Sequence, residues 1–239
     1  ASRFGIMSTN DEGEITKFVE KPKVPESTLA SMGIYIFSYP TLKKYLIENE
    51  NDVGATKDFG KNIIPALLEN HERLYAYRFE GYWKDVGTID SLWEANMDLL
   101  SPTVSLDLYD PAWKIYSNND SRAPQLIGKK ATVQNSMVTT GCVIDGSVEF
   151  SIISGGVTIE EGAVVMDSIL MPGATVKKGA VVEYSIVGEN SVIEAGAVIG
   201  ARPETIANKE EWGIAVVGHD VTIGAGKVVS PKQIISADI

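Results

Sequence analysis

The sequence predicts an α/β layer domain followed by a parallel β-helix built from hexapeptide repeats. In the second half an aliphatic residue returns at spacings of 17, 15, 17 and 17 positions. This track consists of Ile127, Ile144, Ile159, Val176 and Ile193. A second track of Ser136, Ser151, Ser168 and Ser185 runs in step, at spacings of 15, 17 and 17. In the first half, strand-like and helix-like segments alternate, which is typical of an α/β layer arrangement.

A repeat of this length fits a coil of three short strands, about 18 residues around. The aliphatic residues point inward and stack on their equivalents in the next coil, and glycines such as Gly162, Gly179 and Gly196 allow the corners to turn. Because a single coil cannot bury its own apolar row, the coils must stack. Roughly five coils about 4.8 Å apart would make a rod of about 24 Å. The alternative, a sandwich of short strands joined by hairpins, would not keep a 17-residue register.

Composition narrows the class of protein. Of the 239 residues 44% are hydrophobic, which is normal for a packed protein, and the net charge is −11. That charge makes nonspecific binding of nucleic acid or of an anionic membrane unfavourable. Cys142 is the single cysteine, which rules out an internal disulfide and, without a secretion signal, favours the cytoplasm.

The first half is expected to begin with a β-hairpin over residues 4–19, turning at 10–13. Residues 32–37 form an apolar run that predicts a strand buried on both faces. Ser38 is the expected N-cap of a helix with Pro40 in its first turn. Asp58 is the expected N-cap of a second helix, which Pro65 is expected to kink.

A strand is predicted over residues 74–79, and Thr88 is the expected N-cap of a third helix. These elements make up a domain of residues 1–105. A linker over 106–125 follows, including Asn118-Asn119-Asp120, and the β-helix occupies 126–239 with a helical insertion at 201–212.

Three clusters can carry chemistry. Glu20 and Lys21 end a strand, where a carboxylate can accept hydrogen bonds from sugar hydroxyls and an ammonium can neutralise a phosphate; the alternative is a solvated turn. Ser31 precedes the apolar run and is either a binding residue or an ordinary strand start. Asp85 can bind Mg²⁺, which prefers one or two carboxylates together with substrate phosphates; the alternative is a turn residue before the helix.

Several familiar signatures are absent from the sequence: the P-loop, the dinucleotide-binding glycine motif, zinc spacings and HExxH. His71 is expected to be a surface residue and Asp58 only a cap. His219 lies beside the last coils, where some hexapeptide acyltransferases carry a catalytic base; its alternative is a turn residue.

Taken together, these motifs resemble bacterial glucose-1-phosphate adenylyltransferases. The resemblance lies in FGIM at 4–7, FVEKP at 18–22, SMGIYIF at 31–37, DFGK at 58–61 and YWKDVGT at 82–88, followed by the repeats. It implies a Rossmann-like nucleotidyltransferase domain, of which this chain holds the C-terminal part, and a left-handed β-helix. It also implies the reaction of ATP with α-D-glucose 1-phosphate to give ADP-glucose and pyrophosphate in glycogen biosynthesis.

The resemblance assigns roles one residue at a time. Gly5, Glu20 and Ser31 would contact the sugar, Lys21 would bind the sugar phosphate, and Asp85 would be one of two carboxylates that hold a catalytic Mg²⁺. Lys21 and Asp85 would thus be the catalytic residues. The family's ATP-binding half is not in this sequence, so we expect the chain alone to be inactive.

The resemblance also implies an oligomer, either a homotetramer or a hetero-oligomer with a regulatory paralogue. Neither nucleic acid nor a membrane is an expected partner. Three other functions stay open. The chain can be that non-catalytic regulatory paralogue, an oligomerisation module, or a nucleotidylyltransferase for another sugar or base. Arg202, in the insertion at 201–212, is the candidate in the second half of the chain for binding an allosteric effector.

Overall fold

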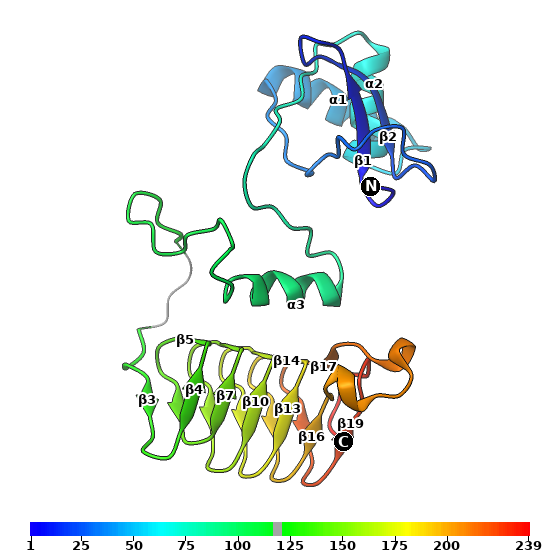
Figure 1. Ribbon diagram of the computed structural model, residues 1–239. Helices are drawn as coiled ribbons and strands as arrows, with labels where there is room; N and C mark the ends of the chain where they lie inside the picture. The colour runs from blue at the N-terminus through cyan, green and yellow to red at the C-terminus, as the bar shows by residue number, and fades with distance from the viewer. Residues whose placement is uncertain (117–120) are drawn as a thin grey trace. The chain divides into compact units, whose positions relative to one another are not determined.

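The computed structural model describes residues 1–116 and 121–239, which form two compact units, Ala1–Glu80 and Gly81–Ile239 (Figure 1). The predicted linker residues Asn118-Asn119-Asp120 lie outside the described residues. Residues 106–116, before that gap, contain no helix or strand. No helix in the described parts of the chain is both long and apolar enough to cross a membrane.

The first unit begins with the predicted hairpin. Strand β1 (Gly5–Thr9) pairs antiparallel with β2 (Ile15–Glu20), and the pairing is irregular between Ser8 and Thr9. Helix α1 (Tyr39–Asn51) follows, and a π-helix, η1 (Phe59–Ile63), leads directly into α2 (Ile64–Glu69). The small core of this unit is formed by Tyr45, Ile63 and Leu67, with Phe37 and Phe59 packed around them.

The helix starts agree with the predicted ones. Ser38 is the N-cap of α1, although its hydroxyl donates to Thr41 Oγ1 (2.8 Å) rather than capping a backbone N–H. Asp58 caps η1 by accepting a hydrogen bond from Lys61 N (2.9 Å), as expected. Pro65 stands at the junction of η1 and α2, where a residue without an N–H is tolerated.

Two expectations about the first unit are wrong. Residues 32–37 do not form a strand buried on both faces: Ile34 is 72% and Ile36 is 99% exposed. Residues 74–79 likewise form no strand beyond an isolated bridge between Glu14 and Tyr75. An extended segment becomes a strand only where a neighbouring strand satisfies its backbone groups. In the part of the chain that the structure describes, the segment 32–37 has no such neighbour.

The second unit contains the left-handed β-helix, with three parallel sheets of six strands each. The first sheet consists of β3 (Leu126–Ile127), β6 (Val143–Ile144), β9 (Thr158–Ile159), β12 (Thr175–Val176), β15 (Val192–Ile193) and β18 (Thr222–Ile223). The second consists of β4 (Thr132–Gln134), β7 (Ser147–Glu149), β10 (Val164–Met166), β13 (Val181–Glu183), β16 (Val198–Ile199) and β19 (Val228–Val229). The third consists of β5 (Met137–Val138), β8 (Ile152–Ile153), β11 (Ile169–Leu170), β14 (Ser185–Val187), β17 (Ala215–Val217) and β20 (Ile234–Ile235).

The predicted repeat is confirmed in its register. Ile144 lies opposite Ile159, and Val176 lies opposite both Ile159 and Ile193, all fully buried in one core. There are six coils, since β18 and β19 continue the stack after the insertion, where Ile223-Gly-Ala-Gly-Lys-Val228 has the pattern of one more hexapeptide coil. The insertion holds two short 3-10 helices, η2 (Pro203–Thr205) and η3 (Lys209–Glu211).

The serine track forms a hydrogen-bonded ladder along one corner. The Ser168 hydroxyl donates to Met166 O (2.7 Å) and accepts from the backbone N–H of Ser185 in the next coil (3.1 Å). Ser151 repeats this pattern toward Ser168. The residue before each serine has a positive φ, as in Tyr184 at 45°, so each serine follows a tight corner and satisfies the backbone exposed there.

Helix α3 (Ile89–Asp98) packs on the β-helix. Thr88 caps it, as the sequence predicts, and the structure adds a capping box with Ser91. Met97 and Leu100 join a cluster with Ile169 and Ile186 of the third sheet. The predicted domain boundary at residue 105 therefore differs from the division of the compact units after Glu80, since α3 belongs structurally to the second unit.

Candidate functional site

Four of the predicted site residues come together in the first unit, around the start of β1. Gly5 pairs in register with Glu20, the last residue of β2. Lys21 follows and donates its backbone N–H to Phe4 O (3.1 Å), and Ser31 donates its own to Gly5 O (2.7 Å). Three segments of the chain therefore meet at Gly5.

Two glycines make room for the Glu20 carboxylate. A Cβ placed on Gly5 would lie 2.8 Å from Glu20 Oε2, and a Cβ on Gly60 of η1 would collide with the same oxygen. The Glu20 side chain is 18% exposed, so it lies half-buried between β1 and η1. The sequence motif at 58–61 contained Gly60, but its contact with Glu20 was not predicted.

Lys21 extends the site toward solvent. Its backbone has a φ of 47°, an uncommon conformation for a residue with a side chain, and such conformations cluster at functional sites. Its Nζ lies 3.8 Å from Glu20 Oε1, and its side chain is 62% exposed. The pair thus presents an acceptor and a cation side by side.

Ser31 is held in a short polar chain. Its Oγ accepts a hydrogen bond from Gly33 N (3.1 Å) and shares another with the Tyr35 hydroxyl (3.0 Å). The Tyr35 ring stacks on Phe59, with centroids 5.7 Å apart and planes at 14°. Tyr35 and Phe59 form an aromatic wall beside Ser31 that sequence reasoning missed, although both lie within the motifs that carried the resemblance.

Asp85 lies in the second unit, in the loop before α3. Its Oδ1 accepts a hydrogen bond from Gly87 N (3.2 Å), so one carboxylate oxygen stabilises a turn. Oδ2 has no such bond to a described residue. In the described part of the chain no group of three or more His, Cys, Asp or Glu side chains can hold a metal ion. A cation at Asp85 would therefore take further ligands from bound phosphates, as Mg²⁺ commonly does.

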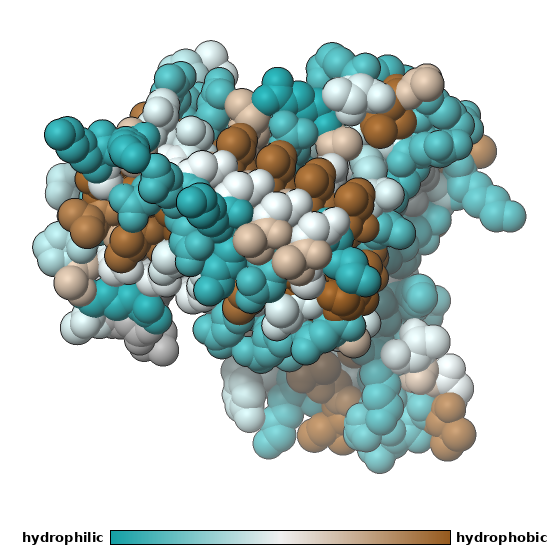
Figure 2. All heavy atoms as spheres, turned by 90° about the horizontal axis from the view of Figure 1, so that it is seen from below, coloured by the Kyte–Doolittle hydropathy of each residue, from teal (hydrophilic) through white to brown (hydrophobic). Residues whose placement is uncertain are grey.

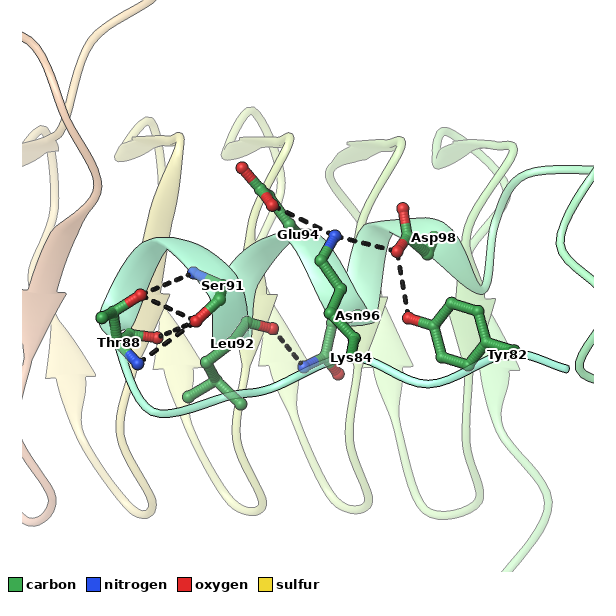
Figure 3. Close-up of polar contacts among 8 residues, drawn as sticks. All are labelled: Tyr82, Lys84, Thr88, Ser91, Leu92, Glu94, Asn96 and Asp98. Atoms are coloured by element: carbon green, nitrogen blue, oxygen red, sulfur yellow. Dashed lines mark hydrogen bonds and ion pairs between the residues drawn. The ribbon is translucent and has the colours of Figure 1, made fainter. Parts of the chain in front are cut away.

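A network of charges fastens the loop of Asp85 to α3 (Figure 3). Lys84 Nζ lies 2.9 Å from Asp98 Oδ2 and 3.1 Å from Glu94 Oε2, and the Tyr82 hydroxyl donates to Asp98 Oδ2 (3.0 Å). The hydrogen bond from Lys84 lowers the pKa of Asp98 below its usual value, and the bond from Tyr82 adds to this shift, while burial opposes it. The network was not predicted from the sequence.

Replacing Lys84 with methionine should destabilise the protein at neutral pH. The lowered pKa of folded Asp98 stabilises the fold above the unfolded pKa, near 4, and this contribution disappears as the pH falls through the folded pKa. Urea denaturation of Lys84→Met should show a loss of about 0.5–1 kcal/mol at pH 7 that shrinks by pH 3. Lys227→Met, at an exposed position, is the control; equal effects of the two substitutions at both pH values would contradict the role of Lys84.

The remaining candidates lie elsewhere. His71 is a surface residue, as expected. The His219 side chain is 82% exposed, and its Nδ1 lies 3.0 Å from Asp220 Oδ2. Arg202 donates from Nε to Glu183 Oε1 (2.9 Å) on the β-helix.

Comparison with known proteins agrees with this architecture. Residues 1–102 match the nucleotidyl transferase family, and residues 123–221 match the GlmU-like C-terminal hexapeptide family. A glucose-1-phosphate adenylyltransferase from Clostridium beijerinckii is 59% identical over 169 residues, which are 71% of this chain and 44% of that protein. Those from Bacillus thuringiensis and Bacillus anthracis are 55% identical over 71% of this chain and 45% of theirs.

The chain is a homologue of glucose-1-phosphate adenylyltransferases. It spans less than half the length of these relatives. The nucleotidyl transferase match includes all five predicted site residues and also α3, which packs on the β-helix. In this glucose-1-phosphate adenylyltransferase homologue, the sequence family and the packing therefore divide the chain at different places.

Proposed function

We propose that the chain supplies the sugar-phosphate-binding part of an enzyme that makes ADP-glucose and pyrophosphate from ATP and α-D-glucose 1-phosphate, in glycogen biosynthesis. The observation that carries the proposal is the half-buried Glu20 carboxylate beside the exposed Lys21 ammonium, above the glycine backbone at Gly5. The names of the relatives supply the nucleotide and the sugar.

Each residue has a chemical role in this proposal. Glu20 accepts hydrogen bonds from glucose hydroxyls, and the sugar lies against the backbone at Gly5, whose lack of a side chain leaves room for the Glu20 carboxylate. Ser31 adds a hydroxyl at the same edge. Lys21 places a compact positive charge near the phosphate of glucose 1-phosphate, which attacks the α-phosphate of ATP in line. Positioning and neutralisation of charge supply the rate in such transfers.

Asp85 is the proposed ligand of the catalytic Mg²⁺. A carboxylate with one oxygen not engaged by a described residue fits this hard cation, which accepts few protein ligands and keeps the rest for phosphates and water. When bound, the ion neutralises charge on the transferring phosphoryl group. The turn to Gly87 and the network through Lys84 hold the carboxylate in place.

We further propose that the protein is a cytoplasmic oligomer, a homotetramer or an assembly with a related regulatory chain. Figure 2 shows hydrophobic residues in rows on the face of the β-helix seen from below. The register aligns Val164, Val181, Val198 and Val228 across the second sheet, and Val228 is 65% exposed. Leu126, on the end strand β3, is 61% exposed beside an unpaired edge, and such edges favour association.

The test is pyrophosphate release by the protein expressed from its complete reading frame, supplied with ATP, Mg²⁺ and glucose 1-phosphate. Lys21→Ala should raise the KM for glucose 1-phosphate by about 10- to 100-fold, because a hydrogen bond to a charged group contributes about 1.5–3 kcal/mol. Lys23→Ala, two residues away and exposed, is the matched control.

Two outcomes would overturn this proposal. Equal KM values for the two lysine variants would remove Lys21 from the sugar-phosphate site. A folded protein that releases pyrophosphate only with a partner chain, and is then insensitive to Lys21→Ala, would be the regulatory paralogue.

A further inference from the structure

A cavity lies in the first unit, at the opposite end of β1 from Gly5. It has a volume of about 330 Å³. Four hydroxyl side chains line it, together with one guanidinium: Ser8, Thr9, Ser27, Thr28 and Arg78. This volume is at the lower end of the range of small-molecule sites, about 300–1,000 Å³.

The charge of the cavity is opposite to that of the chain. The chain carries a net charge of −11, yet no carboxylate lines this cavity. Among the described residues, none forms a hydrogen bond or ion pair with the Arg78 guanidinium, whereas Arg202 pairs with Glu183. Arg78 therefore offers five uncommitted N–H donors and a permanent positive charge.

The hydroxyl groups are also free to donate. Ser27 Oγ accepts a hydrogen bond from Leu29 N (3.0 Å), and this leaves its own proton available. Within the described residues, no acceptor is paired with the hydroxyls of Ser8, Thr9 or Thr28. Since the guanidinium cannot accept a hydrogen bond, a ligand in this cavity must present acceptors toward it and can take the hydroxyl protons as well.

The backbone is arranged to bring these side chains together. In a regular strand Ser8 and Thr9 would point to opposite faces, but both line the cavity. The pairing of β1 with β2 shifts between these two residues, and the extra residue, Thr16, donates its hydroxyl to Ser8 O (3.2 Å). The bulge lies in β2 and increases the local twist of the pair, and bulges are frequent beside functional sites. On the other side of β1, Met7 N donates to Leu29 O (3.0 Å), which holds the segment with Ser27 and Thr28 in place.

We propose that this cavity binds a phosphate group, either inorganic phosphate or the phosphoryl group of a small monoester. A guanidinium with several hydroxyl donors matches the oxygens of a phosphate, and the absence of a lining carboxylate removes the repulsion that the rest of the chain would exert. The site is separate from the Glu20–Lys21 pair and does not depend on the function proposed for that pair.

The experiment titrates the full chain with inorganic phosphate and, separately, with glycerol 3-phosphate, following backbone amide shifts by NMR and heat by calorimetry. All variants carry Lys21→Ala, so that the other proposed phosphate site is removed. Arg78→Gln should weaken binding by about tenfold or more, since it removes a charge-assisted contact. Thr28→Val should weaken it less, and Arg73→Gln, at an exposed position outside the cavity, should not change it.

The amides of Ser8, Thr9 and Thr28 should shift on addition of phosphate, and these shifts should be lost in Arg78→Gln. Tighter binding of glycerol 3-phosphate than of phosphate would identify a phosphorylated metabolite as the ligand, and equal binding would identify free phosphate. The proposal is overturned if these amides do not respond, or if Arg78→Gln and Arg73→Gln bind phosphate equally well while their spectra show a folded protein.

Discussion

Replacing Trp93 with alanine should lower the free energy of opening of helix α3 by about 3 kcal/mol, near the lower end of the range for losing a packed tryptophan. Trp93 anchors this helix on the β-helix in two ways. Its Nε1 donates to Asp167 O (2.7 Å), and its ring lies 5.7 Å from the ring of Tyr184. Tyr184 in turn meets Trp212 edge to face at 5.3 Å, so three aromatic rings connect α3, the β-helix and the insertion.

Native-state hydrogen exchange of the α3 amides is the measurement, because the helix can open without unfolding of the β-helix. Trp93→Phe keeps a ring but loses the hydrogen bond to Asp167 O. It should lower the free energy of opening of α3 by about 1 kcal/mol for that bond, and further because the smaller ring buries less apolar area. Trp113→Ala is the control, since Trp113 is 82% exposed. If Trp93→Ala changes the protection of α3 no more than Trp113→Ala does, the helix is held by its other contacts.

The β-helix was predictable because its determinants are local and repeated. Once Ile159, Val176 and Ile193 are aligned, the coil length and the inward row follow. The spacing of the serines was visible in the sequence, but its cause was not. The ladder requires each serine to follow a corner residue with positive φ, which only the path of the backbone reveals.

The attachment of α3 was not predictable, because its partners are far away in the sequence. The Trp93–Asp167 hydrogen bond joins residues 74 positions apart. In the helix predicted after Thr88, Leu92, Trp93 and Leu100 follow helical spacing and mark an apolar face, but such a face does not indicate which surface covers it. The expected boundary at residue 105 assigned the helix to the domain that precedes it in sequence.

In the first unit, the hairpin determined how much of the candidate site could be predicted. The predicted hairpin over residues 4–19 placed Gly5 in one strand and ended next to Glu20, but the pairing of Gly5 with Glu20 was not itself predicted. The contact of Gly60 with Glu20 depends on packing of η1 and was not foreseen. The apolar run at 32–37 was read as a buried strand, yet burial is decided by neighbours that a run of hydrophobic residues does not specify.

Asp85→Asn should lower the kcat for pyrophosphate release about 100- to 1,000-fold, if Asp85 holds the metal as we propose. A catalytic cation contributes several kcal/mol to stabilising the transferred phosphoryl group, and each 1.4 kcal/mol corresponds to about tenfold in rate. The substitution is chosen because it separates two roles of the side chain. Asparagine keeps an oxygen that can accept the hydrogen bond from Gly87 N, so the turn before α3 is preserved while the negative charge is lost.

The dependence on Mg²⁺ distinguishes a metal ligand from a residue that only shapes the loop. Asp85→Asn should raise the Mg²⁺ concentration needed for half-maximal activity, whereas Asp90→Asn, an exposed carboxylate in the first turn of α3, should not. Asp85→Ala, which loses the charge and the turn together, should be less active and also less stable. If Asp85→Asn keeps the parent's kcat and Mg²⁺ dependence while Asp85→Ala loses both stability and activity, then Asp85 acts only through its hydrogen bond to Gly87. The cation would in that case be held by residues other than Asp85.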